Sequence, residues 1–145
     1  MSFGFPVRVY WEDTDAGGIV FYANYLKFME RARTEWLRSL GVAQRRLREE
    51  TGGQFVVSET TLKYHRPARL DDELLVTADV QHIGAASLTI GQRVLSRTEQ
   101  GLLLCEGTIR IGWVDAATLR PARIPAQVSG TLERQRSSMS QPSSL

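Results

Sequence analysis

The chain has 145 residues, of which 42% are hydrophobic, and its 18 lysines and arginines nearly balance 16 aspartates and glutamates. This composition suits one packed domain, and the scattered arginines exclude a continuous basic surface for a nucleic-acid backbone. The single cysteine, Cys105, excludes an internal disulfide. With only two histidines a zinc site is hard to build, so we expect no metal and no cofactor.

The first predicted elements are a strand and a long helix. In residues 5–11 apolar side chains alternate with polar ones, which is the period of a half-buried strand. Over residues 24–40 apolar side chains recur at steps of three and four, which predicts a helix with one buried stripe. Gly41 is a residue type common just after a helix, and a shorter amphipathic helix is predicted over 42–50.

Four strand-like runs follow, at residues 54–64, 73–82, 87–97 and 101–114, and the breaks between the last three are of hairpin length. A strand, a long helix and then antiparallel strands make an α+β order, which predicts a sheet of about five strands curved around the helix. Such a sheet leaves an edge strand, and pairing with a second copy is the simplest way to cover it. We therefore expect a homo-oligomer.

The C-terminal end of the chain carries little apolar sequence. From about Gln127 the chain is rich in serine and ends in RQRSSMSQPSSL, so we predict one domain over 1–126 and a flexible tail over 127–145. The first residues lack a signal-peptide pattern, and no apolar run approaches the ~20 residues of a membrane-spanning helix. We therefore expect a cytoplasmic protein without a transmembrane segment.

The segment DTDAGG, residues 13–18, lies between the first strand and the long helix. Its glycines allow tight backbone geometry, and Asp15 lies close to a helix start, where main-chain NH groups have no partner within the helix. A carboxylate can attack a carbonyl carbon or draw a proton from water, while such NH groups receive the negative charge on the carbonyl oxygen. The same residue types are also ordinary in turns, and Asn24 makes a good N-cap without any catalytic role.

Two motifs carry a resemblance to a known family. The stretch VRVYWEDTDAGGIVFYANYLKFMERARTEWL, together with YHRPARLDDEL downstream, resembles the hotdog-fold acyl-CoA thioesterases of the 4-hydroxybenzoyl-CoA thioesterase family. Within that family it is most similar to the YbgC branch, which is associated with the Tol-Pal envelope system. The similarity extends from Val7 to about Pro125. It implies a long helix wrapped by an antiparallel sheet, assembly as dimers and commonly homotetramers, and an active site shared between subunits.

The resemblance also implies an activity, the hydrolysis of an acyl-CoA thioester to a free carboxylic acid and CoA. By this resemblance Asp15 is the nucleophile or the general base, and the main-chain NH of Tyr22, at the helix start, polarises the carbonyl. Many members of the YbgC branch carry histidine at the position of Tyr22, which bears on rate and acyl preference. Gly17 and Asn24, beside these residues, are expected to contact the substrate.

Coenzyme A carries phosphates, and Lys63, Arg66 and Arg69 near the RPARLDD turn are candidates to bind them. In the alternative, the arginines pair with the acidic residues of that turn, Asp71, Asp72 or Glu73. The expected substrate is an acyl-CoA, or an acyl group on acyl carrier protein. The expected location is the cytoplasm, including the periphery of the inner membrane.

A non-catalytic hotdog module that binds acyl-CoA or serves in assembly is the alternative function. Dehydratases of the same fold need a paired Asp and His, and no histidine occurs in the first 64 residues. The G-x-S-x-G motif of serine hydrolases and the P-loop motif are absent from the sequence. His65 lies in a strand-like run that ends at Pro67, where a packed or surface histidine is the common outcome.

Overall fold

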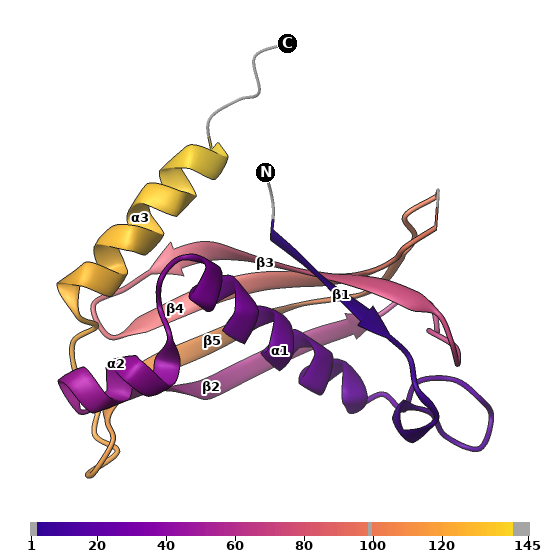
Figure 1. The fold of residues 1–145 in the computed structure, drawn as a ribbon, viewed down its shortest axis with the longest axis horizontal. Helices are drawn as coiled ribbons and strands as arrows, with labels where there is room; N and C mark the ends of the chain where they lie inside the picture. The colour runs from indigo at the N-terminus through magenta and orange to yellow at the C-terminus, as the bar shows by residue number, and fades with distance from the viewer. Residues whose placement is uncertain (1–2, 99, 141–145) are drawn as a thin grey trace.

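The fold is a five-stranded antiparallel sheet with a long helix packed against it. The structure, a computed structural model, describes residues 3–98 and 100–140, without the side chains of 137–140. The strands lie in the order β1-β3-β4-β5-β2, so that β1 and β2 form the two edges of the sheet (Figure 1). In chain order the elements are β1 (Phe3–Arg8), the short 3-10 helix η1 (Trp11–Asp13), α1 (Asn24–Ser39), α2 (Gln44–Thr51), β2 (Gly53–Tyr64), β3 (Glu73–Ile83), β4 (Ser87–Ser96), β5 (Leu103–Asp115) and α3 (Ala126–Ser140).

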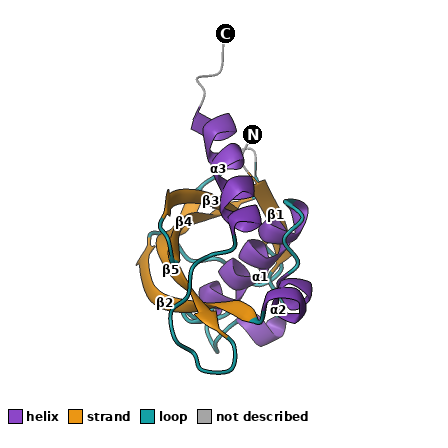
Figure 2. Ribbon diagram, turned by 90° about the vertical axis from the view of Figure 1, so that its left-hand side faces the viewer, coloured by secondary structure: helices purple, strands orange, loops and turns teal. Residues whose placement is uncertain are grey.

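Helix α1 is enclosed by the curved sheet (Figure 2). Its inward stripe includes Phe28, Met29 and Ala32, and alternate residues of the facing strands, such as Leu88 and Ile90 of β4, are equally buried. Each large apolar side chain buried in this way contributes about 1.5 to 3 kcal/mol to the stability of the fold. The predicted α+β architecture, a long central helix wrapped by about five antiparallel strands, is therefore confirmed.

A buried polar network ties α1 to the middle of the sheet. The Nη1 atom of Arg33 donates to Oε1 of Gln92 at 2.9 Å, and Nε2 of Gln92 donates to the main-chain oxygens of Met29 and Thr77 at 3.0 and 3.1 Å. Burial lowers the pKa of Arg33, and the charge of Glu30 opposes this effect. Because hydrogen bonds are directional and apolar contacts are not, the network sets where α1 sits along the sheet.

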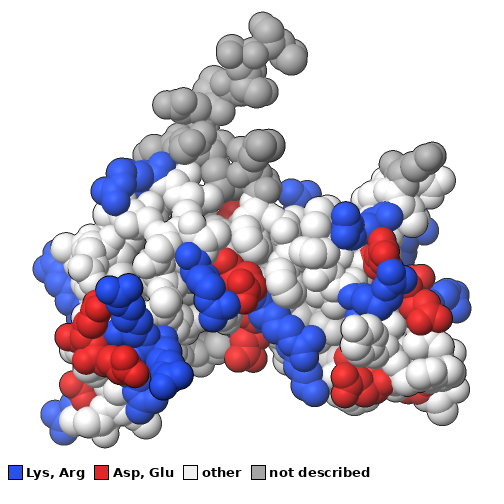
Figure 3. All heavy atoms as spheres, in the orientation of Figure 1, with Lys and Arg blue, Asp and Glu red and all other residues white. Residues whose placement is uncertain are grey.

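Charged side chains are mixed over the face that carries α1 and α2. Arg45 pairs with Glu49 and Arg46 pairs with Glu50, one helical turn further along α2. Figure 3 shows lysines and arginines beside acidic side chains on this face, and no continuous basic track crosses it. Exposed pairs of this kind add little to stability, so they act mainly to keep the surface solvated.

The C-terminal segment differs from the flexible tail predicted over 127–145. Helix α3 packs against β3 through its first half, and Val128 and Leu132 are buried. The prediction counted apolar residues over the whole segment, whereas these two, four positions apart, fall on one face of a helix. Residues 141–145 lie outside the described residues. No helix in the described part of the chain is both long and apolar enough to cross a bilayer.

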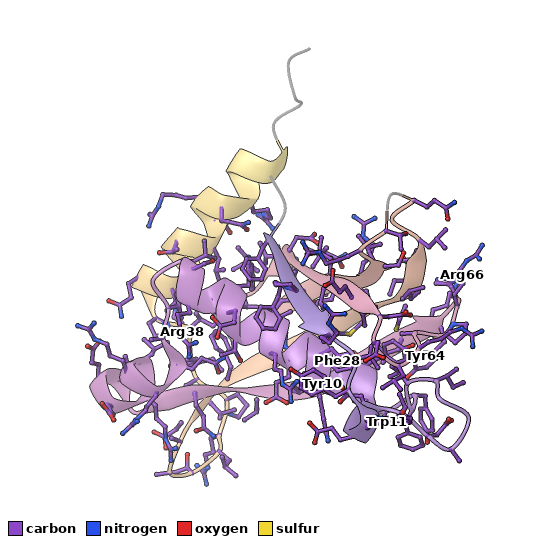
Figure 4. The ribbon with its side chains drawn as sticks, turned by 45° about the vertical axis from the view of Figure 1, so that its right-hand side comes forward. Tyr10, Trp11, Phe28, Arg38, Tyr64 and Arg66 are labelled. Carbon is purple, nitrogen blue, oxygen red and sulfur yellow. The ribbon has the colours of Figure 1, made fainter. Side chains whose placement is uncertain are left out.

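The first strand ends earlier than predicted. It stops at Arg8, and Trp11, predicted to lie in this strand, instead begins η1 with 76% of its surface exposed. The Oδ2 atom of Asp13 accepts a hydrogen bond from the Tyr10 main-chain NH at 2.8 Å, which closes a local turn in place of further strand pairing. Trp11 therefore lies beside the loop that follows (Figure 4).

Replacing Leu132 with alanine tests whether α3 belongs to the fold. The substitution removes a fully buried side chain, so we expect the free energy of unfolding in urea titrations to fall by about 2 to 4 kcal/mol. Gln127→Ala, at an exposed position of the same helix, is the matched control and should change it by less than about 0.5 kcal/mol. Equal stability of the two variants would contradict the packing of α3.

Candidate active site

A tight loop between η1 and α1 carries Asp15. The Asp15 main-chain NH donates to the oxygen of Ile19 at 2.9 Å, and the Gly18 NH donates to the oxygen of Asp15 at 3.0 Å. Gly18 has a φ of 77°, the left-handed region that glycine adopts without strain. The Oδ1 atom of Asp15 accepts from the Gly17 NH at 2.8 Å, and Asp15 is exposed. The carboxylate is thus held by a main-chain donor and remains accessible to a ligand.

The Asp15 loop is fastened to the turn that precedes β3. Ile19 forms an isolated antiparallel bridge with Arg69. On either side of it, the Val20 NH donates to the oxygen of Ala68 at 2.8 Å and the Leu70 NH donates to the oxygen of Gly18 at 3.1 Å. The DTDAGG and RPARLDD motifs, far apart in the sequence, therefore form one structural unit.

The same loop is joined to the start of α1. The main-chain oxygen of Asp13 accepts from the Phe21 NH at 3.0 Å and from the side-chain amide of Asn24 at 2.8 Å. The N-cap position belongs to Ala23, so the interpretation of Asn24 as the N-cap is wrong. The structure gives the Asn24 amide a role in holding the loop, and a contact between Asn24 and substrate stays a prediction.

The main-chain NH groups of Tyr22 and Ala23 lie directly before α1. Neither donates to a protein acceptor within residues 3–98 and 100–140. The start of a helix adds partial positive charge at this position, which favours an anionic or strongly polarised oxygen as partner. Tyr22 is 63% exposed, so a ligand can approach this part of the chain. Its role in polarising a carbonyl stays a prediction.

Three tyrosines meet at the start of α1. Tyr25 is buried, and its hydroxyl accepts a hydrogen bond from the Ala68 NH at 3.1 Å. The ring of Tyr64, at the end of β2, lies with its centroid 5.5 Å from that of Tyr25 and 6.3 Å from that of Tyr22. The Tyr64 hydroxyl donates to the main-chain oxygen of Tyr22 at 3.1 Å. Sequence reasoning missed Tyr64, whose one signal is its position at a strand end just before RPARLDD.

The three predicted contacts to coenzyme A lie at different places. Lys63 lines a hollow of about 430 Å³ and, as the neighbour of Tyr64 in a strand, points to the opposite face of the sheet. Arg66 extends away from the sheet at the end that carries Tyr64 (Figure 4). Arg69 lies in the turn that pairs with the Asp15 loop. Within the described residues neither arginine forms an ion pair.

A different arginine holds the acidic turn. Arg8, at the end of β1, forms an ion pair with Glu73 and donates from Nη1 to the main-chain oxygen of Asp71 at 2.9 Å. The register of β1 and β3 places Arg8 opposite Glu73. The alternative in which Arg66 or Arg69 pairs with the acidic side chains of the turn is therefore wrong, and both guanidinium groups stay available.

His65 and Cys105 are two other side chains of the candidate site region that could react as a base or a nucleophile. The Nε2 atom of His65 lies 3.1 Å from Oε1 of Glu106. Cys105 is fully buried, and this burial, together with the charge of Glu106, raises the pKa of its thiol to about 11. The thiol is therefore protonated at neutral pH and is a poor nucleophile.

Comparison with known proteins places this chain in a family. Residues 9–132 match the family model described as the thioesterase-like superfamily. The chain belongs to this superfamily. It is 44% identical over 127 residues to the acyl-CoA thioesterase YbgC of Haemophilus influenzae, a match that covers 88% of this chain and 91% of that relative. It is 40% identical over 126 residues to the acyl-CoA thioester hydrolase YbgC of Escherichia coli O6:H1, with 87% and 92% covered.

Solved structures agree on the fold of this superfamily member. The 1,4-dihydroxy-2-naphthoyl-CoA thioesterase from Synechocystis superposes with a TM-score of 0.83 at 20% sequence identity, over 98% of this chain and 100% of that one. The predicted resemblance to hotdog-fold thioesterases, and to the YbgC branch among them, is confirmed by these matches.

Gly18→Ala tests the geometry of the Asp15 loop. Alanine is strained at a φ of 77°, so we expect the free energy of unfolding to fall by about 1 kcal/mol in urea titrations. Gly130→Ala, within helix α3, is the control and should raise it by about 0.5 to 1 kcal/mol, because alanine favours helices. A Gly18→Ala protein as stable as the parent would contradict the left-handed conformation.

Alkylation of Cys105 tests the assigned burial. At pH 8 a thiol with a pKa of about 11 is almost wholly protonated, whereas an unfolded cysteine, with a pKa near 8.5, is partly ionised. We expect iodoacetamide to label the folded protein at least about a hundredfold more slowly than the urea-unfolded protein, as followed by mass spectrometry. Comparable labelling rates would show that the thiol is accessible and ionised.

Proposed function

We propose that this protein is an acyl-CoA thioesterase, which hydrolyses an acyl-CoA to a free carboxylic acid and CoA. The observation that carries the proposal is the accessible Asp15 carboxylate, held on a loop that is hydrogen-bonded to the turn before β3 and to the start of α1. Membership of the thioesterase-like superfamily and the names of the two YbgC relatives support the same activity.

In the proposed reaction Asp15 acts on the thioester in one of two ways. It attacks the carbonyl carbon and forms an anhydride that water then cleaves, or it removes a proton from the water that attacks. In both routes negative charge develops on the carbonyl oxygen, and the main-chain NH of Tyr22 receives it. The sulfur of coenzyme A leaves as a thiolate and takes up a proton. The hydrogen bond from Gly17 engages Oδ1 and leaves Oδ2 for the chemical step.

Arg66 and Arg69 are the preferred candidates for the phosphates of coenzyme A. Both lie at the end of the molecule that carries the Asp15 loop, and neither guanidinium is engaged in an ion pair with a described residue. Arginine binds phosphate oxygens through two parallel hydrogen bonds. Lys63, on the opposite face of the sheet from Tyr64, is the weaker candidate. An acyl group on carrier protein presents the same thioester to Asp15.

A second copy of the chain is proposed to cover the site. Trp11, Phe21, Tyr22 and Tyr64 are each at least 45% exposed, and the last three cluster at the start of α1. Exposed aromatic side chains that lie together are unusual on a monomer and mark an interaction surface. A homodimer or homotetramer would bury them and exclude water from the thioester, which strengthens the electrostatic interactions within the site.

Asp15→Asn tests the proposed function. Purified protein is offered a panel of acyl-CoAs, and the released thiol is followed. For each substrate that the parent hydrolyses we expect kcat/KM to fall at least about a hundredfold, because the variant keeps the side-chain shape but lacks the base or nucleophile. Glu12→Gln, which neutralises an exposed acid in η1, is the matched control and should stay within about twofold of the parent.

Two results would count against the proposal. Equal turnover by the parent and Asp15→Asn would remove Asp15 from the mechanism. Binding of acyl-CoA by the parent without release of thiol would favour the non-catalytic module. Where turnover occurs, a single turnover in ¹⁸O-labelled water separates the two routes, because label enters the Asp15 carboxylate only through the anhydride.

A further inference from the structure

The Tyr64 hydroxyl reaches the peptide group directly in front of α1. Its acceptor, the oxygen of Tyr22 at 3.1 Å, belongs to the peptide that joins Tyr22 to Ala23. A hydrogen bond to an amide oxygen polarises the whole amide and increases the positive charge on its NH, which here is the NH of Ala23. Within the described ranges this NH, like that of Tyr22, has no protein acceptor.

We propose that Tyr64 is a positioning residue for the thioester carbonyl. It orients and polarises the peptide between Tyr22 and Ala23, so that the Ala23 NH joins the Tyr22 NH as a second donor to the carbonyl oxygen. Consecutive main-chain NH groups at a helix start form a concave site suited to developing negative charge. The inference rests on the proposed thioesterase function and adds to it Tyr64, the last residue of the edge strand β2.

The Tyr64 side chain is held well enough to act in this way. Its residue is still paired within the sheet, opposite Cys105 of β5. Its ring makes an edge contact with the buried Tyr25, and the Tyr25 hydroxyl is itself fixed by the Ala68 NH. Ala68 in turn accepts from Val20 at the end of the Asp15 loop. One chain of contacts therefore connects β2, the start of α1 and the loop that carries the carboxylate.

The Tyr64 hydroxyl also keeps its proton over the working range of a thioesterase assay. Burial, with smaller contributions from Cys105 and Tyr22, raises the pKa of Tyr64 above its ordinary value near 10. Burial likewise raises the pKa of Tyr25, whose ring also contacts that of Tyr64. Tyr64 is therefore a hydrogen-bond donor throughout neutral and mildly alkaline conditions, and its contribution should not change between about pH 6 and pH 9.

Tyr64→Phe removes the hydroxyl and keeps the ring contacts. We expect kcat to fall about fivefold to tenfold, with KM within about twofold of the parent, because the lost hydrogen bond acts on charge that develops in the transition state. A thioether analogue, with a methylene in place of the carbonyl, should bind both proteins equally. Tyr10→Phe, which removes another exposed hydroxyl (Figure 4), is the matched control and should keep the parent kcat.

Three results would overturn the inference, and they differ from one another. Equal kcat in the parent and Tyr64→Phe would show that the hydroxyl does not act on the reaction. A higher KM together with weaker binding of the thioether would give Tyr64 a purely structural role. Absence of turnover by the parent protein would overturn the thioesterase function itself and this inference with it.

Discussion

Main-chain pairing between residues 18–20 and residues 68–70 is the interaction on which the rest of the site depends. The Asp15 loop is exposed and contributes little to the core, so without this pairing it would open locally at low cost. Hydrogen bonds from Val20 and Leu70, on either side of the Ile19 bridge, attach it to the turn that leads into β3. The carboxylate therefore moves with the sheet.

The main-chain NH groups of Tyr22 and Ala23, in contrast, move with α1. Apolar packing alone would let a helix slide along the sheet, so hydrogen bonds at two levels set its position. Near the middle, Gln92 bonds both the sheet and the main chain of α1, and Arg33 completes the network. At the N-terminal end, the Asn24 amide and the Tyr64 hydroxyl fix the first turn against the loop and β2. The Asp15 loop and the start of α1 are therefore both attached to elements of the same sheet.

Helices and strands could be predicted from the sequence where apolar residues recur at a constant helical or strand spacing. Helix α1 and strands β2 to β5 have bounds close to the predicted ranges. Helix α1 and strands β3 to β5 bury repeated positions along their length, whereas β2, at the sheet edge, is mostly exposed and was recognised from its strand-like composition. Helix α3 was missed because Val128 and Leu132 give too short an apolar pattern. The end of β1 was missed because a hydrogen bond from the Tyr10 NH to the Asp13 side chain forms there instead of further strand pairing. The sequence located Asp15 and Tyr22 in a loop before a helix, and the resemblance supplied their proposed roles. The contacts of Arg8 and Tyr64 depend on strand register, which local sequence does not encode.

The proposed stabilisation of the carbonyl oxygen uses the main-chain NH of Tyr22 and does not depend on the Tyr22 side chain. The NH of Tyr22 is present whatever the side chain, so substitution there leaves the donor in place. The Tyr22 ring, packed against Phe21 at 4.8 Å and against Tyr64 at 6.3 Å, instead forms part of the exposed surface beside that donor. Under the proposed mechanism, a bulky ring at this position would limit which acyl groups reach the donor NH. If the proposed mechanism holds, the histidine that the resemblance implies for many YbgC-branch members and the tyrosine present here would differ more in acyl preference than in mechanism, because the side chain shapes the site while the main chain stabilises the charge.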